Sequence, residues 1–126
     1  DRIHALLHGW LLPKIQQSKY HLSKGYGIAS DYFAEYMHIM RKDTLSVKLS
    51  NEIEFSNNFT IRDEKAVKRV LSGLIKLLYP DGSYDKSELK ILADYAVSAR
   101  QSIRNWLHKI APGEFMREEL SVNVKG

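Results

Sequence analysis

Cysteine is absent from this sequence of 126 residues, and proline occurs only three times. The lack of cysteine excludes disulfide bonds and zinc sites built from thiolates. No apolar run approaches the roughly 18–20 residues that a helix needs to cross a bilayer. The first residues also lack the layout of a signal peptide. We therefore expect a cytoplasmic protein that makes no membrane contact.

The sequence also lacks the motifs of common catalytic and metal sites. No glycine-rich turn ends in Gly-Lys-Ser/Thr, so the chain has no loop that holds nucleotide phosphates by itself. The five histidines do not have the spacing of metal ligands, and no serine lies in a Gly-x-Ser-x-Gly turn. We predict no catalytic residue, no metal site and no cofactor bound by this chain alone.

The composition is otherwise that of an ordinary folded domain. Hydrophobic residues make up 44% of the chain, which is enough for a core. The net charge of +4 suits an anionic partner but does not choose between a nucleotide, a nucleic acid and an acidic protein. The chain starts at Asp1-Arg2 without a methionine and becomes apolar at once, so we expect a piece of a longer protein.

The most informative stretch runs from Thr60 to Gly82 and has the pattern of an amphipathic helix. Thr60 and Asp63 have the spacing of a capping box, with Asp in place of the usual Glu or Gln. Pro80 and the Asp-Gly pair after it end the helix. An apolar stripe recurs at three- and four-residue steps: Val67, Val70, Leu71, Leu74, Ile75 and Leu78.

Two further helices are predicted on the same grounds. One spans about residues 28–42, with an apolar stripe that includes Phe33 and Met37. The other follows Asp85, a candidate N-cap, and ends at Ala111-Pro112-Gly113.

The remaining segments are predicted to be extended or irregular. We expect a strand at Ile3–Leu7 and a second extended piece to Ile15, with a short helix as the alternative, and a loop from Gln16 to Gly27. Residues 43–58 alternate weakly and suggest an extended connector or a short pair of strands. The tail after Phe115 is strand-like or a linker.

The predicted fold is therefore mainly α: a small helical bundle with short strands or extended segments at both ends. We expect residues 1–27 to be the end of a preceding core and a linker, residues 28–113 to be the bundle, and residues 114–126 to lead toward a following domain.

The basic residues of the two long helices are the candidate contacts for an anion or DNA. Phosphate binding requires that such cations converge on one surface. The candidates are Lys65, Lys68, Arg69, Lys76, Arg100 and Arg104. Both helices also carry acidic residues, so a solvated basic face without a ligand is the alternative.

Several segments together resemble a known family. They are the opening DRIHALLHGWLLPKI, then GYGIASDYFAEYMHIMRK, then AVKRVLSGLIKLLYPDGSYDKSEL, and a long helix that ends in NWLHKI. These resemble the second half of the AAA+ module in the Lon-related ATPases of BREX phage-defence systems, which are often named ATP-dependent Lon-type proteases. The likeness covers nearly the whole chain, and the bundle is similar to AAA+ lid domains.

The resemblance implies roles for three cations. Arg2 matches an arginine that can act as a finger toward the nucleotide of a neighbouring subunit, where a guanidinium neutralises charge on the γ-phosphate. Lys68 takes the place where Lon-like proteins have the sensor-2 arginine of the lid, and Arg69 is next to it. A lysine offers a point charge rather than a fork, so either residue is a candidate for the sensor.

The first hypothesis is therefore a nucleotide-sensing lid and oligomer-contact region of an ATP-dependent, Lon-like AAA+ protein. The fragment itself would not be catalytic, whereas the parent would use ATP, with magnesium, in a homo-oligomeric ring that acts on DNA or on a protein substrate. The alternative is a basic helical module that binds DNA or another protein.

Overall fold

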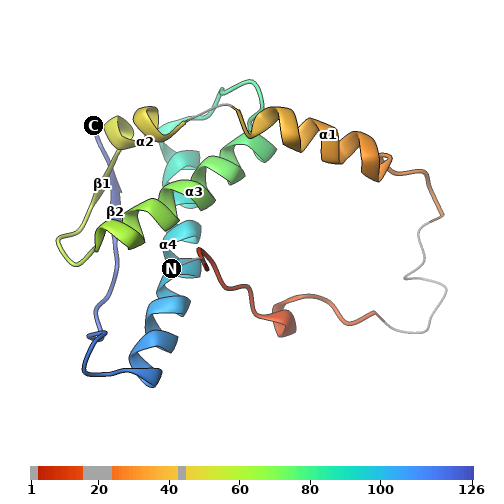
Figure 1. Ribbon diagram of the computed structural model, residues 1–126. Helices are drawn as coiled ribbons and strands as arrows, with labels where there is room; N and C mark the ends of the chain where they lie inside the picture. Colours follow the sequence, from red (N-terminus) through yellow and green to blue (C-terminus); the bar gives the residue numbers. More distant parts are fainter. Residues whose placement is uncertain (1–2, 16–23, 43–44) are drawn as a thin grey trace. The chain divides into compact units, whose positions relative to one another are not determined.

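The computed structural model describes residues 3–15, 24–42 and 45–126 (Figure 1). The chain divides into two compact units, one made of Asp1–Leu6 with Thr44–Gly126 and the other of Leu7–Asp43. The described residues are mainly α-helical, with a short antiparallel sheet of two strands. The predicted fold class, a small and mainly α bundle, is confirmed.

The unit Leu7–Asp43 contains a short 3-10 helix and one α-helix. Helix α1, Ser30–Met40, lies inside the predicted range of 28–42. The strand expected at Ile3–Leu7 is not formed, and η1, Gly9–Leu11, follows instead. The rings of His8 and Trp10 stack within this segment, with centroids 4.2 Å apart. Residues 16–23 of the predicted loop lie outside the described residues.

The larger unit begins its regular structure with helix α2, Ser46–Glu52, followed by strand β1, Ile53–Phe55. The prediction of an extended connector or strand pair for residues 43–58 was therefore wrong over α2. The alternation of Val47 with Leu49 suggested a strand, but Val47 is exposed while Leu49 is fully buried. Leu45, which packs partly buried against the core, precedes Leu49 by one helical turn, so the pattern that matters has the period of a helix.

Two long helices form the centre of this unit. Helix α3, Ile61–Leu78, and helix α4, Lys86–Ile110, lie across each other in Figure 1. Both begin with a complete capping box, from Thr60 and Asp63 in α3 and from Asp85 and Glu88 in α4. Gly82, with φ of +74°, allows the sharp turn between them. The predicted starts and ends of both helices are confirmed.

The carboxyl-terminal segment closes the core instead of leaving it. Strand β2, Val122–Val124, pairs antiparallel with β1, with Ile53 opposite Val124 and Phe55 opposite Val122. The main buried cluster draws on α2, α3, α4, both strands and Leu120, and contains no residue of α1. Its members are Leu49, Ile53, Val67, Leu71, Ile75, Leu89, Ala93, Ala96, Val97, Leu120 and Val122.

Among the residues that the structure describes, no helix combines the length and apolar character needed to cross a membrane.

Candidate functional site

The most unusual residue of the larger unit is Asp63, a carboxylate that is fully buried at the start of α3. Its backbone N–H donates to the Thr60 hydroxyl at 3.3 Å, and its own Oδ2 accepts from the Thr60 N–H at 3.2 Å and from the Thr60 hydroxyl at 2.7 Å. The capping box therefore fixes where the carboxylate lies. The negative charge also suits the positive end of the helix dipole.

Two arginines from α4, one turn apart, meet this carboxylate. Arg100 Nε lies 2.8 Å from Asp63 Oδ1, and Arg104 Nη1 lies 3.3 Å from Asp63 Oδ2. Arg100 and Arg104 are only 6% and 8% exposed. Sequence analysis placed both among the candidate contacts on a basic surface, whereas the structure places them inside the protein as partners of a buried acid.

The environment favours the ionised form of Asp63. Burial by itself raises the pKa of the carboxyl, but the hydrogen bonds from Thr60 and Arg100, together with the positive charge of Arg100, outweigh burial and hold the pKa below its ordinary value. A buried charge is tolerated only when it is paired in this way. The cluster therefore carries one negative and two positive charges between α3 and α4.

The second arginine extends the cluster toward the carboxyl-terminal segment. Arg104 Nη2 lies 3.5 Å from Glu118 Oε2, while its Nε is buried and has no hydrogen-bond partner. A cavity of about 420 Å³ lies along this side of the cluster. Its wall includes Arg62, Arg104, Leu107, Glu114 and Phe115.

The first arginine holds the amino-terminal segment. Arg100 Nη1 donates to the carbonyl oxygen of Ile3 at 2.8 Å, and the Leu6 N–H donates to the carbonyl of Ala99 at 3.4 Å. Residues 3–6 lie beside α4 in Figure 1. Residues 3–6 are therefore bound to α4.

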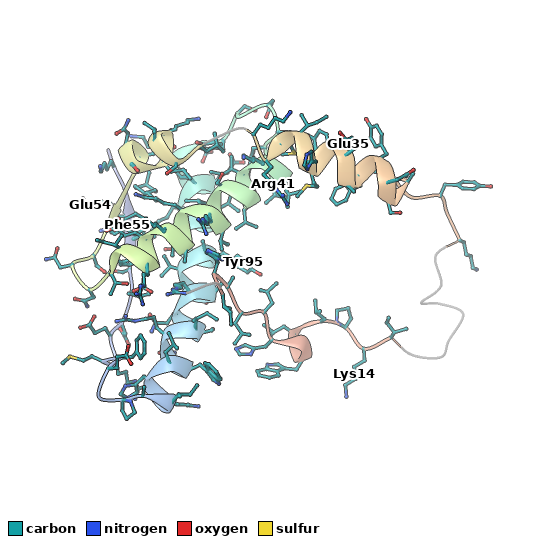
Figure 2. The ribbon with its side chains drawn as sticks, viewed as in Figure 1. Lys14, Glu35, Arg41, Glu54, Phe55 and Tyr95 are labelled. Carbon is teal, nitrogen blue, oxygen red and sulfur yellow. The ribbon has the colours of Figure 1, made fainter. Side chains whose placement is uncertain are left out.

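The adjacent cations Lys68 and Arg69 lie in different surroundings. Lys68 Nζ is 3.7 Å from Glu64 Oε2 and 5.3 Å from the centre of the Phe55 ring. Figure 2 shows Phe55 on β1, beside the first turns of α3. Arg69 is exposed, and its Nη1 lies 2.6 Å from His4 Nε2. Because a guanidinium can only donate, His4 Nε2 is the acceptor of this bond.

The other predicted site residues are less informative. Lys65 is exposed on α3, and Lys76 is half-buried near the end of that helix. Arg2 lies outside the described residues. Sequence analysis recognised Asp63 only as a helix cap. The sequence does contain a signal: an Asp at the third position of a capping box, followed on the next helix by two arginines four residues apart. Only the fold shows that Asp63 meets Arg100 and Arg104.

Among the described residues, no group of three or more histidines, aspartates or glutamates could hold a metal ion. The ionisable groups of the Asp63 cluster bond to one another and to the backbone of residues 3–6, so the arrangement can bind and position segments.

Comparison with known proteins defines the class to which this chain belongs. Residues 1–121 match the family described as Lon-like protease BrxL-like, ATPase domain. The chain belongs to this family, and the resemblance to Lon-related ATPases is confirmed.

Two relatives identify the particular protein that the chain is similar to. It is 38% identical over 115 residues to Lon-like protease BrxL of Escherichia coli O9:H4 (strain HS) and, over the same length, to Lon-like protease BrxL of Bacillus cereus (strain H3081.97). Each alignment covers 91% of this chain but only 16% and 17% of the respective relative. The chain therefore spans a small part of the proteins that it matches.

Proposed function

We propose that this chain is the nucleotide-sensing lid of an oligomeric AAA+ ATPase and that Arg69 is its sensor. The ATPase-domain family supports nucleotide use by the parent protein. The observation that carries the assignment is the 2.6 Å contact between Arg69 and His4. It joins a cation of α3 to the segment that begins with Asp1-Arg2, the pair that would leave the nucleotide-binding core.

Arg69 suits this role better than Lys68. The Lys68 side chain is mostly covered and is engaged by Glu64 and by the Phe55 ring, so recruiting it would break both contacts. Arg69 is exposed, and among the described residues its guanidinium contacts the imidazole acceptor of His4, which a phosphate can replace. Its planar fork also matches phosphate oxygens better than an ammonium does.

Bound ATP, with magnesium, would supply the γ-phosphate whose presence the lid reports. Arg69 would bind that charge from the lid of the same subunit, and Arg2 would reach the nucleotide of a neighbouring subunit in a homo-oligomeric ring. In this arrangement the chain would sense the nucleotide and would not cleave a bond itself. We place the parent in the cytoplasm and in BREX phage defence.

The alternative, a basic DNA-binding surface, is less well supported. Such a surface would need Arg100 and Arg104 beside Lys76, yet both arginines are buried against Asp63. The charges of both arginines are paired with acidic side chains inside the protein. Of the six candidate cations, Lys65 and Arg69 are the ones that are exposed.

The test is ATP turnover by the intact protein that contains this chain, measured for Arg69→Ala, Lys68→Ala and the double variant. Loss of one charged hydrogen bond to a phosphate should cost about 1.5–3 kcal/mol, a fall of roughly tenfold or more in kcat/KM for Arg69→Ala. Lys68→Ala should change it less than threefold. Unchanged turnover in both single variants and in the double variant would contradict the proposal.

The finger role of Arg2 is tested by mixing subunits. Arg2→Ala should reduce turnover of the assembled ring, and added variant subunits should inhibit wild-type subunits beyond simple dilution. If the activity of the mixtures is strictly proportional to the fraction of wild-type subunits, Arg2 does not act on the nucleotide of a neighbouring subunit.

The work of the parent is tested with two potential substrates. Stimulation of turnover by double-stranded DNA would indicate a DNA-acting motor, whereas stimulation by an unfolded protein that is also cleaved would indicate a Lon-type protease.

A further inference from the structure

One face of α3 carries basic residues and no acidic ones. The two acidic residues of this helix are engaged elsewhere, since Asp63 is buried against Arg100 and Glu64 pairs with Lys68. Steps of three, four and seven residues keep side chains on the same face of a helix. Four cations follow one another on this face at those steps: Arg62, Lys65, Arg69 and Lys76.

Lys65 and Arg69 are the pair within this row that is exposed and one helical turn apart. Side chains at this spacing are neighbours, and two like charges there destabilise a helix. The His4 imidazole accepts a hydrogen bond from Arg69 but brings no negative charge. Among the residues that the structure describes, no acidic side chain pairs with Lys65. An anion bound between the two cations would therefore relieve their repulsion.

The next helix shows that two cations with this spacing can hold one anion. Arg100 and Arg104 of α4 are also four residues apart, and both contact the carboxylate of Asp63. Arg100 Nε lies 2.8 Å from Oδ1, and Arg104 Nη1 lies 3.3 Å from Oδ2. That anion is supplied by the chain and is buried. On the exposed face of α3, the corresponding anion would come from a bound ligand.

We propose that Lys65 and Arg69 together bind the terminal phosphate of a nucleoside triphosphate, so that Lys65 is a second phosphate-binding residue. This inference rests on the proposed nucleotide-sensing function of Arg69 and names a further residue of the same site. The two side chains differ in chemistry. Arg69 supplies a planar fork of donors, and Lys65 adds a compact charge that can donate to a remaining phosphate oxygen.

The first experiment measures the affinity of the intact protein for a fluorescent, non-hydrolysable ATP analogue and for fluorescent ADP. Lys65→Ala should weaken binding of the ATP analogue about tenfold, the value of one charged hydrogen bond to phosphate, but that of ADP less than about threefold. Lys65→Arg keeps a cation and should bind the analogue within about threefold of wild type. Lys86→Ala is the control, because it removes an exposed lysine at the start of α4, and it should bind as wild type does.

The two cations should not act independently of each other. If they bind the same phosphate, the loss of Arg69 displaces that phosphate, and Lys65 then contributes less. The double variant Lys65→Ala/Arg69→Ala should therefore bind the analogue at least about threefold more tightly than the product of the two single losses predicts.

The chemical reactivity of the Lys65 amine gives a readout that does not depend on variants. The intact wild-type protein is treated with an amine-acylating reagent, and the modified peptides are quantified by mass spectrometry. Saturation with the ATP analogue should remove most of the acylation at Lys65, whereas ADP should not. Acylation of Lys86 should be the same in all states.

The outcomes separate this inference from the proposed function. If Lys65→Ala binds as wild type does while Arg69→Ala binds weakly, or if Lys65 is not protected by the analogue, the inference is overturned and Arg69 remains the sensor. Single losses that multiply in the double variant would also overturn the shared phosphate. Protection of Lys65 by double-stranded DNA, but not by the analogue, would assign this face to nucleic acid instead. If neither variant changes binding of the analogue, both the inference and the proposed function are wrong.

Discussion

At the scale of single residues, one carboxylate of α3 joins that helix to two arginines of α4. Asp63 is a helix cap, an ion-pair partner and a buried charge at once, and its bonds to Thr60, Arg100 and Arg104 satisfy these roles together. Buried ion pairs add little net stability but are costly to break, because the remaining charge is left without a partner. The cluster should therefore act mainly to fix geometry.

Asp63→Asn should destabilise the protein by about 3–5 kcal/mol, because it leaves two buried guanidinium groups facing a neutral amide. Chemical denaturation of the chain gives the free energy of unfolding. Asp85→Asn is the matched control: Asp85 caps α4 in the same way but is exposed, and asparagine caps about as well as aspartate, so the cost should stay below about 0.5 kcal/mol. Equal costs at the two positions would contradict the account of Asp63.

The Asp63 cluster should also make the free energy of unfolding depend on pH. Because the pKa of Asp63 is lowered in the folded state, its ionisation stabilises the fold above the ordinary value of 3.8, and this contribution is lost as the pH falls through the lower folded value. Unfolding free energies of wild type and Asp63→Asn, measured from pH 6 downward, should therefore begin to converge only once the pH falls below 3.8. A difference that stays constant well below pH 3.8 would show that Asp63 does not carry the effect.

At the scale of elements, the sequence predicts a helix well where caps and apolar spacing agree. Both long helices have a side-chain cap, a stripe and a stop, and each was located correctly. Helix α2 has no side-chain cap and only seven residues, so the spacing of Val47 and Leu49 was interpreted as the alternation of a strand. How deeply a residue of an apolar stripe is buried also depends on which elements pack against that part of the helix.

Leu71 of α3 is fully buried, but Leu78, in the same predicted stripe, is 60% exposed because the helix ends beyond the core.

The two leucines of α3 provide a test of this packing. Leu71→Ala should cost about 2–5 kcal/mol, since it leaves a cavity in the main core, whereas Leu78→Ala should cost less than about 1 kcal/mol. Both are measured by denaturant unfolding of the same chain. Similar losses for the two variants would mean that the end of α3 is covered more fully than the structure indicates.

The candidate site was only partly predictable for a physical reason. The pattern of α4 shows that Arg100 and Arg104 share a face, but not that this face meets the start of α3. The meeting depends on the crossing of α3 and α4 and on the return of residues 3–6 to the bundle, which are long-range features. Lys68 and Arg69 were recognised by resemblance, and only their different partners separate them.

At the scale of the whole molecule, the segments before and after the helices of the larger unit both return to its middle. Residues 3–6 bind α3 and α4, and β2 pairs with β1 about seventy residues earlier in the sequence. Leu120 and Val122 are buried in the main core. The carboxyl-terminal segment, which the sequence predicted to be strand-like or a linker, thus forms a strand that is a structural part of the bundle up to β2.

Val122→Ala should therefore destabilise the chain by about 2 kcal/mol, because it removes two buried methyl groups where β2 meets the core. Val47→Ala, the same change at an exposed position of α2, should have an effect within about 0.5 kcal/mol. The two free energies of unfolding are compared under identical conditions. A negligible loss of unfolding free energy in Val122→Ala would contradict the claim that the carboxyl-terminal segment is part of the core.

The central claim, that Arg69 senses nucleotide, is tested most directly by the affinity of the intact protein for a fluorescent ATP analogue. We predict that Arg69→Ala weakens binding by about tenfold or more, the value of one charged hydrogen bond to phosphate, while Lys68→Ala binds within about threefold of wild type. Unchanged affinity in Arg69→Ala, or a larger loss in Lys68→Ala, would contradict the claim.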